Sequence, residues 1–201
     1  MRDFASPKVP ELGERGENVS AVVHQMCADK DRKQQFLDWI AALSAPQLVD
    51  IQFARNDLLE VLMQFVEANG EPRTISARSI SDGTLRFVGL LAALFSAPEG
   101  SVFLMEEIEN GLHPTRIHLI IELLEQFAET RKLQIIATTH SSQVLLALSP
   151  SALRDVILFA RTEDTPGTIT RRLGDLDHFD EVTQRTDIDR LFTTGWLEQA
   201  V

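Results

Sequence analysis

The sequence is poor in cysteine and holds no long apolar run. Cys27 is the single cysteine among 201 residues, which excludes an internal disulfide and fits a reducing cytosol. No segment approaches the roughly 20 continuous apolar residues that a membrane span needs. Residues 1–7 also lack the apolar run of a signal peptide. We therefore expect a cytoplasmic protein that makes no contact with a membrane.

Basic residues are the second shortage. The chain carries 19 lysines and arginines against 30 aspartates and glutamates, for a net charge of -11. General binding of a nucleic-acid backbone relies on an excess of basic side chains. We therefore expect any DNA contact to be indirect or made through a partner, while a local basic patch stays open. The length and the hydrophobic content of 44% suit one soluble domain over residues 1–201.

A glycine-rich loop ending in lysine is also missing. No stretch reads G-x-x-x-x-G-K-[ST], the loop whose backbone N–H groups and lysine hold nucleotide phosphates. None of the four lysines follows a glycine; they are Lys8, Lys30, Lys33 and Lys132. The chain therefore has no phosphate cradle of this kind.

The apolar pattern predicts an α/β protein with a small antiparallel element. An irregular lead-in is expected over 1–18. Helices are predicted at 18–28, 31–43, 84–95, 114–131, 141–148 and 191–197. Strands are predicted at 48–54, 58–67, 73–78, 101–105, 133–137, 156–160 and 169–172. The order strand, helix, strand, helix, strand from residue 101 onward is typical of a parallel sheet with crossover helices.

Some of these elements carry more specific expectations. Asn18 is predicted to cap the first helix and Ser81 the helix at 84–95, which is apolar almost all round and should be deeply buried. The segment 58–67 also suits a helix, but the hairpin signal Asn69-Gly70 favours a strand. The continuous apolar runs at 101–105 and 133–137 predict strands that are buried on both faces.

Two carboxylates follow the strand at 101–105. Glu106 and Glu107 lie where it ends, and ligands bind at the carboxyl edge of parallel sheets. One carboxylate there can hold a hydrated Mg²⁺, and its neighbour can orient or deprotonate an attacking water. A pair of ordinary surface glutamates is the simpler alternative. The sequence Glu109-Asn110-Gly111-Leu112-His113-Pro114, which leads into a helix, strengthens the functional interpretation.

Two further segments carry polar groups that suit phosphate. Ser81-Asp82-Gly83 begins a helix whose first turn has free N–H groups, although a plain N-cap explains the same residues. His140 follows the strand at 133–137 and can hydrogen-bond a terminal phosphate, although a lone loop histidine is commonly structural. The spacing of His113 and His118 does not support a zinc site.

Together these segments resemble a known family. Ile80–Thr84 resembles the ABC signature motif, Val102–Glu107 the Walker B strand, Glu109–Pro114 the D-loop and Ile136–His140 the switch-histidine strand. The residues of these motifs are similar to those of AAA_21-type, RecF- and SMC-like ABC ATPases, which include OLD-like and other antiphage defence proteins. The stretch from Gly13 to Val19 resembles one that these proteins carry well before the signature.

The resemblance implies the C-terminal lobe of a P-loop NTPase head that uses ATP and Mg²⁺. It implies catalytic roles for Glu107 and His140, nucleotide contacts from Ser81, Asp82, Gly83 and His113, and a metal contact from Glu106. Two departures stand out. Asp82 replaces the glycine that is common in transporters, and Glu106 stands where many members have aspartate. The Walker A half, which would precede these motifs, is absent from the chain.

Two functional classes follow from this resemblance. In the first, the chain is the signature and hydrolysis half of an ATPase coupled to DNA repair or antiphage defence. It is then inactive alone and needs a Walker A-containing half or a second ATPase head, in a homo- or hetero-oligomer. In the second, it is a non-catalytic interaction module that docks on a partner ATPase or a nuclease effector.

Overall fold

The computed structural model describes residues 1–8, 11–43, 48–68, 70–161, 167–176 and 179. The chain forms two compact units. Unit 1 comprises Met1–Val102 with Glu129–Gln134, and unit 2 comprises Phe103–Ala128 with Ile135–Val201. Among the described residues, no helix is long and apolar enough to cross a bilayer. The predicted helix at 191–197 lies outside the described residues.

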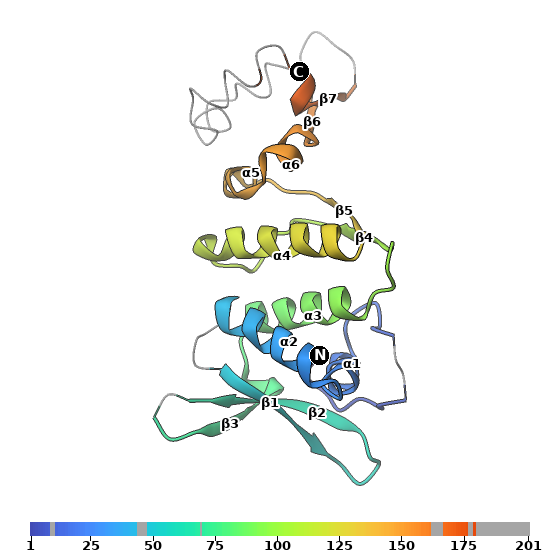
Figure 1. Ribbon diagram of the computed structural model, residues 1–201, viewed down its shortest axis with the longest axis vertical. Helices are drawn as coiled ribbons and strands as arrows, with labels where there is room; N and C mark the ends of the chain where they lie inside the picture. The colour runs from blue at the N-terminus through green and yellow to red at the C-terminus, as the bar shows by residue number, and fades with distance from the viewer. Residues whose placement is uncertain (9–10, 44–47, 69, 162–166, 177–178, 180–201) are drawn as a thin grey trace. The chain divides into compact units, whose positions relative to one another are not determined.

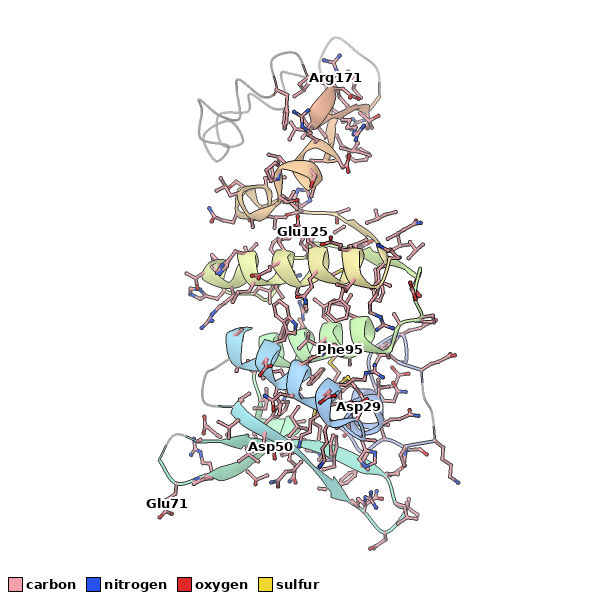
Figure 2. All side chains as sticks on the ribbon, in the orientation of Figure 1. Asp29, Asp50, Glu71, Phe95, Glu125 and Arg171 are labelled. Atoms are coloured by element: carbon pink, nitrogen blue, oxygen red, sulfur yellow. The ribbon has the colours of Figure 1, made fainter. Side chains whose placement is uncertain are left out.

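Unit 1 opens with an irregular segment and two helices, as the sequence predicts. The helices are α1 (Val19–Met26) and α2 (Lys30–Leu43). The prediction that Asn18 caps α1 is wrong. Its side chain instead accepts a hydrogen bond from the Gly13 N–H and donates one to the Glu11 carbonyl, so it fastens the lead-in rather than the helix. Asp29, labelled in Figure 2, accepts from two first-turn N–H groups of α2.

A three-stranded antiparallel sheet follows these two helices in unit 1. Its order is β1 (Leu48–Arg55), β2 (Val61–Glu67) and β3 (Arg73–Ser76). The hairpin signal therefore favoured the correct structure, and the helical alternative for 58–67 is wrong, although β2 begins only at Val61. Helix α1 packs on β2 and α2 on β1 (Figure 1), which buries large side chains of both layers. These include Phe36, Ile40, Ile51, Met63 and Phe65.

The apolar helix of unit 1 is α3 (Asp82–Ser96), and both of its ends are capped by side chains. The Ser81 hydroxyl accepts from the Thr84 N–H, which confirms the predicted N-cap. At the other end, the Arg131 guanidinium donates to the carbonyls of Leu94, Phe95 and Ala97. Most of the apolar side chains of α3 are buried, as expected; they are Leu85, Phe87, Val88, Leu91, Ala92, Leu94 and Phe95.

The strand β4 (Val102–Met105) pairs with β5 (Gln134–Ala137). The Gln134 N–H donates to the Ser101 carbonyl and the Thr138 N–H to the Met105 carbonyl. Both partners advance by four residues between these bonds, so the strands are parallel. The prediction of burial on both faces is wrong. Leu104 is 77% exposed and Ile136 is 60% exposed. A continuous apolar run is compatible with one covered face as well as two.

Helices follow each of these strands in unit 2. The 3₁₀ turn Pro114–Arg116 leads into α4 (Ile117–Thr130), and α5 (Ser142–Ala147) follows β5. Ile117 and Ile121 of α4 pack with Val144 of α5 in one buried cluster. A short helix, α6 (Pro150–Arg154), was not predicted from the sequence. Ser149 caps it by accepting from the Ala152 N–H.

The last described strands of unit 2 form a separate antiparallel pair. Strand β6 (Ile157–Ala160) pairs with β7 (Ile169–Arg172), as the sequence predicts. However, β6 is not hydrogen-bonded to the β4–β5 pair in the described part of the chain, so the three expected parallel strands do not make one continuous sheet. A cluster of Leu145, Leu153, Leu173, Leu176 and Phe179 anchors this end of unit 2.

Candidate functional site

The loops after β4 and β5 are joined by hydrogen bonds at the carboxyl edge of the parallel pair. The Glu107 N–H donates to the Thr138 hydroxyl at 3.1 Å. The Ile108 N–H donates to the Thr138 carbonyl at 3.2 Å. These hydrogen bonds between the two loops follow from the parallel pairing, because parallel strands end at the same edge of a sheet. They bring the segment that holds Glu106 and Glu107 next to the segment that holds His140.

Glu107 has an unusual backbone conformation. Its φ is +47°, in the left-handed region that costs an ordinary residue free energy. The Asn110 N–H donates to the Glu107 carbonyl at 2.8 Å, and the Asn110 side-chain amide lies 3.4 Å from the Glu107 carboxylate. The turn therefore holds Glu107 in a strained position with its side chain exposed. Such strain is concentrated at functional sites in proteins.

Glu106 and His140 present free side chains. Both residues are exposed, and within the described part of the chain neither the Glu106 carboxylate nor the His140 imidazole has a hydrogen-bond or ion-pair partner. They are thus available to an incoming group. His113 is instead engaged locally. Its Nδ1 lies 2.8 Å from the Thr115 hydroxyl and caps the 3₁₀ turn.

Glu109 is a residue that the sequence reasoning missed. Its carboxylate accepts from the Thr139 hydroxyl at 2.8 Å and from the His140 N–H at 2.9 Å. It is half-buried, unlike Glu106 and Glu107. The signal available in the sequence was a third acidic residue in the run Glu-Glu-Ile-Glu, but nothing in that run says which segment it contacts.

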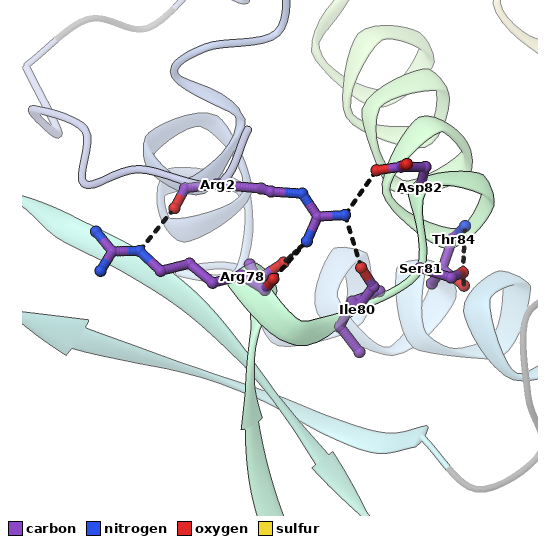
Figure 3. A network of polar contacts seen from close by, with 7 residues as sticks. Arg2, Arg78, Ile80, Ser81, Asp82 and Thr84 are labelled. Carbon is purple, nitrogen blue, oxygen red and sulfur yellow. Dashed lines mark hydrogen bonds and ion pairs between the residues drawn. The ribbon is translucent and has the colours of Figure 1, made fainter.

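The residues that resemble the signature lie in unit 1. The Ser81 hydroxyl is used by the helix cap and lies 2.8 Å from the Thr84 hydroxyl. Arg2 reaches the same turn from the lead-in (Figure 3). Its guanidinium donates to the backbone carbonyls of Arg78 and Ile80 and to the Asp82 carboxylate, with which it forms an ion pair at 2.6 Å.

This ion pair bears on the departure from the transporter pattern at Asp82. A carboxylate at the first turn of α3 suits the helix dipole but repels a phosphate. The hydrogen bond and the charge of Arg2 lower the pKa of Asp82 and hold it ionised. The same guanidinium offsets the negative charge of that carboxylate. An anion approaching the turn therefore meets a neutral pair rather than an isolated negative charge.

The residues present suit a magnesium–nucleotide group only in part. Among the described residues, no group of three His, Cys, Asp or Glu side chains could hold a metal by itself. Mg²⁺ commonly binds through one or two carboxylates together with the phosphates of its nucleotide. The exposed Glu106 carboxylate meets that requirement. The missing donors are those of a phosphate loop, which the sequence lacks.

The parallel pair β4–β5 is joined by the crossover helix α4 and has acidic residues at its carboxyl edge, where α/β folds bind their ligands. The family model described as "AAA domain, putative AbiEii toxin, Type IV TA system" matches residues 18–147, which is more than half of the chain. The chain belongs to this AAA domain family. No curated protein sequence matches it.

Several solved SMC heads share the fold. An SMC ATPase from a study of ATP-driven dimerization and DNA-stimulated activation is 13% identical, with a TM-score of 0.52 over 82% of this chain and 98% of that chain. A Smc head bound to the C-winged helix domain of ScpA is 13% identical, with a TM-score of 0.53 over 81% and 48%. The Pyrococcus furiosus Smc head bound to the C-terminal domain of ScpA is 12% identical, with a TM-score of 0.51 over 82% and 42%. The chain thus spans less than half of the last two proteins.

Proposed function

We propose that this chain is the signature and hydrolysis half of an ABC-type ATPase head, which works with a second polypeptide segment that carries the phosphate loop. The observation that carries the proposal is the pair of hydrogen bonds that join the loops after β4 and β5. These hydrogen bonds keep the Glu106–Glu107 pair beside the segment that holds His140. These 201 residues hold no phosphate loop, so in this proposal the nucleotide cradle comes from another polypeptide segment.

Each residue has a separate role in this proposal. Bound Mg²⁺ would neutralise charge on the nucleotide phosphates. Glu106, with its unpartnered carboxylate, is the residue that would hold it. Glu107 orients the attacking water or accepts its proton. His140 donates a hydrogen bond to the terminal phosphate, and the turn of Ser81, Asp82 and Gly83 contacts the nucleotide of a partner head.

The proposal extends to partners and setting. The similarity to an SMC ATPase studied for ATP-driven dimerization supports an oligomeric ATPase. We propose a cytoplasmic role in DNA repair or antiphage defence, with DNA reached through a partner and a nuclease as a candidate effector. His113, which caps the turn before α4, contacts the bound nucleotide in this proposal.

Calorimetry on the isolated chain tests the first part of the proposal. Without a phosphate loop, the triphosphate loses most of its backbone donors and its lysine. The isolated chain should therefore show no micromolar binding of ATP with Mg²⁺. Micromolar binding by contaminant-free protein would contradict the assignment of the chain as half of a site.

Reconstitution tests the second part. The partner is sought in neighbouring reading frames that encode G-x-x-x-x-G-K-[ST], and the purified complex is assayed for ATP hydrolysis. Glu107→Gln should keep nucleotide binding but slow turnover by roughly 10²- to 10⁴-fold, the scale of a lost general base. Glu106→Gln should weaken the dependence on Mg²⁺. The control Glu122→Gln alters an exposed glutamate of α4 and should change neither.

One observation favours the alternative, a non-catalytic module that docks on a partner ATPase or nuclease. Large apolar side chains of unit 2 are exposed on β4, β5 and β6, as a docking surface requires; they are Leu104, Ile136, Ile157 and Phe159. Full activity of a reconstituted complex that carries Glu107→Gln would favour this alternative.

A further inference from the structure

Glu109 differs from its two acidic neighbours in what its carboxylate contacts. Both of its oxygens are used, one by the Thr139 hydroxyl at 2.8 Å and the other by the His140 N–H at 2.9 Å. Both donors belong to the loop after β5, whereas Glu109 belongs to the loop after β4. The carboxylate therefore bridges two segments that lie 30 and 31 residues apart in the chain.

The bridge continues beyond these two bonds. The Thr139 hydroxyl, which donates to Glu109, also accepts from the Ser141 N–H at 3.0 Å. Ser141 immediately precedes α5. On its own side, Glu109 accepts at its backbone carbonyl from the Leu112 N–H at 3.0 Å. One side chain thus ties the turn that follows Glu107 to the start of the next helix.

The chemistry of the bridge favours a fixed geometry. A carboxylate accepts stronger hydrogen bonds than a neutral oxygen does, and Glu109 is half-buried, where competition from water is reduced. The His140 backbone is held at its nitrogen while its imidazole has no partner among the described residues. The contact therefore positions the His140 backbone, and it leaves the imidazole free to bind another group.

We propose that Glu109 is a positioning residue that holds the His140 segment in register with the Glu106–Glu107 segment. The importance of that register for hydrolysis rests on the proposed function, but the contact itself does not. Glu109 acts through the Thr139 hydroxyl and the His140 N–H, and has no assigned contact with nucleotide. The sequence gives it no such role, because its partners become neighbours only when β4 and β5 pair.

Amide hydrogen exchange on the isolated 201-residue chain tests the contact without any ATPase activity. Glu109→Ala removes both acceptors, so exchange of the His140 N–H should accelerate about tenfold or more. Glu109→Gln keeps one acceptor oxygen and should restore part of the protection. Glu122→Ala changes an exposed glutamate of α4 and should have no effect.

Thr139→Val provides a second, milder variant. It removes the hydroxyl that donates to Glu109 but leaves the His140 N–H bond available, so acceleration at His140 should be smaller than in Glu109→Ala. Protected amides of α4 report whether each variant remains folded. If Glu109→Ala folds and the exchange rate at His140 is unchanged, the proposal is overturned. If Glu109→Ala does not fold, the proposal is overturned when both Thr139→Val and Glu109→Gln leave that rate unchanged.

The reconstituted complex supplies a separate readout. Glu109→Ala should lower kcat about tenfold or more with little change in KM, and Glu109→Gln should recover part of the loss. A wild-type complex without ATPase activity would contradict the proposed function while leaving the exchange result intact. Normal kcat in Glu109→Ala, with accelerated exchange, would show that the register does not matter for hydrolysis and would overturn the positioning role.

Discussion

The Asp82 side chain is strongly exposed, and an arginine of the N-terminal lead-in lowers its pKa. The hydrogen bond and charge of Arg2 lower the pKa of Asp82. A carboxyl with a lowered folded-state pKa stabilises the fold above its ordinary pKa, and loses that contribution as pH falls through the lowered value. Arg2→Ala should raise the pKa of Asp82 toward its ordinary value. An NMR titration of the carboxyl carbon measures the shift.

Arg15 offers the matched control for this titration. It is another arginine of the lead-in, it is exposed, and its side chain has no assigned contact with Asp82. Arg15→Ala should leave the titration of Asp82 unchanged. If Arg2→Ala also leaves it unchanged, the ion pair of Figure 3 does not set the charge at the first turn of α3.

Glu107 makes a second prediction at the scale of one residue. Its φ of +47° is strained for any side chain with a Cβ but not for glycine. Glu107→Gly should therefore exceed Glu107→Ala in free energy of unfolding by about 1 kcal/mol. Urea denaturation of both variants measures the difference. Equal stabilities would mean that the backbone at residue 107 is not left-handed in solution.

The sequence predicted some of these residues and not others, for a physical reason. Glu106, Glu107 and His140 could be proposed because each lies within a few residues of the end of an apolar strand, which is a local pattern. The contacts of Glu109 and Arg2 could not be predicted. They join residues about 30 and 80 positions apart, and those distances close only after tertiary folding.

At the scale of elements, local signals predicted helices and hairpins well. Ser81 caps α3 as expected, and the Asn69-Gly70 signal correctly favoured strands over a helix for residues 61–67. The apolar runs at 101–105 and 133–137 predicted strands but misjudged their burial. Periodicity reports which residues can be buried, whereas actual burial depends on whether another layer covers each face. Asn18 shows the same limit, because its side chain found partners outside the helix.

Substitution of two closely packed glycines should change the free energy of unfolding in opposite directions. Gly89 lies inside α3, and a Cβ there would meet the end of the flexible Met1 side chain at 2.6 Å. Because alanine is the better helix former, Gly89→Ala should raise the free energy of unfolding by up to about 1 kcal/mol. A Cβ at Gly174 would lie 2.9 Å from the Arg154 carbonyl oxygen of α6. Backbone must shift there, so Gly174→Ala should destabilise by about 1 kcal/mol or more.

Circular dichroism during chemical denaturation measures both variants in parallel. Each serves as the control for the other, because both make the same chemical change in a different packing environment. A loss of stability in Gly89→Ala would show that the Met1 side chain cannot move aside. A neutral Gly174→Ala would show that α6 and the turn at 173–175 do not pack closely in solution.

At the scale of the whole molecule, the described sheets are incomplete. The β4–β5 and β6–β7 sheets contain two strands each in the described part of the chain, so within that part each of these strands has a neighbouring strand on one side only. Leu104 is 77% exposed and Phe159 is 71% exposed on these strands. Open strand edges and exposed apolar side chains both favour association with another chain. In the proposed function, the segment that carries the phosphate loop would cover such a surface.

The isolated chain should therefore self-associate, and its mass by light scattering should rise with concentration. Leu104→Lys and Phe159→Lys put a charge on the exposed apolar surface, so each should lower the mass toward that of a monomer. Glu122→Lys, which changes the charge of an exposed helical residue, should not. A clean monomer at high concentration, with no added partner, would mean that the chain closes its own core in solution. That result would favour a free-standing interaction module over one half of a divided ATPase head, and the reconstituted ATPase assay would then decide between them.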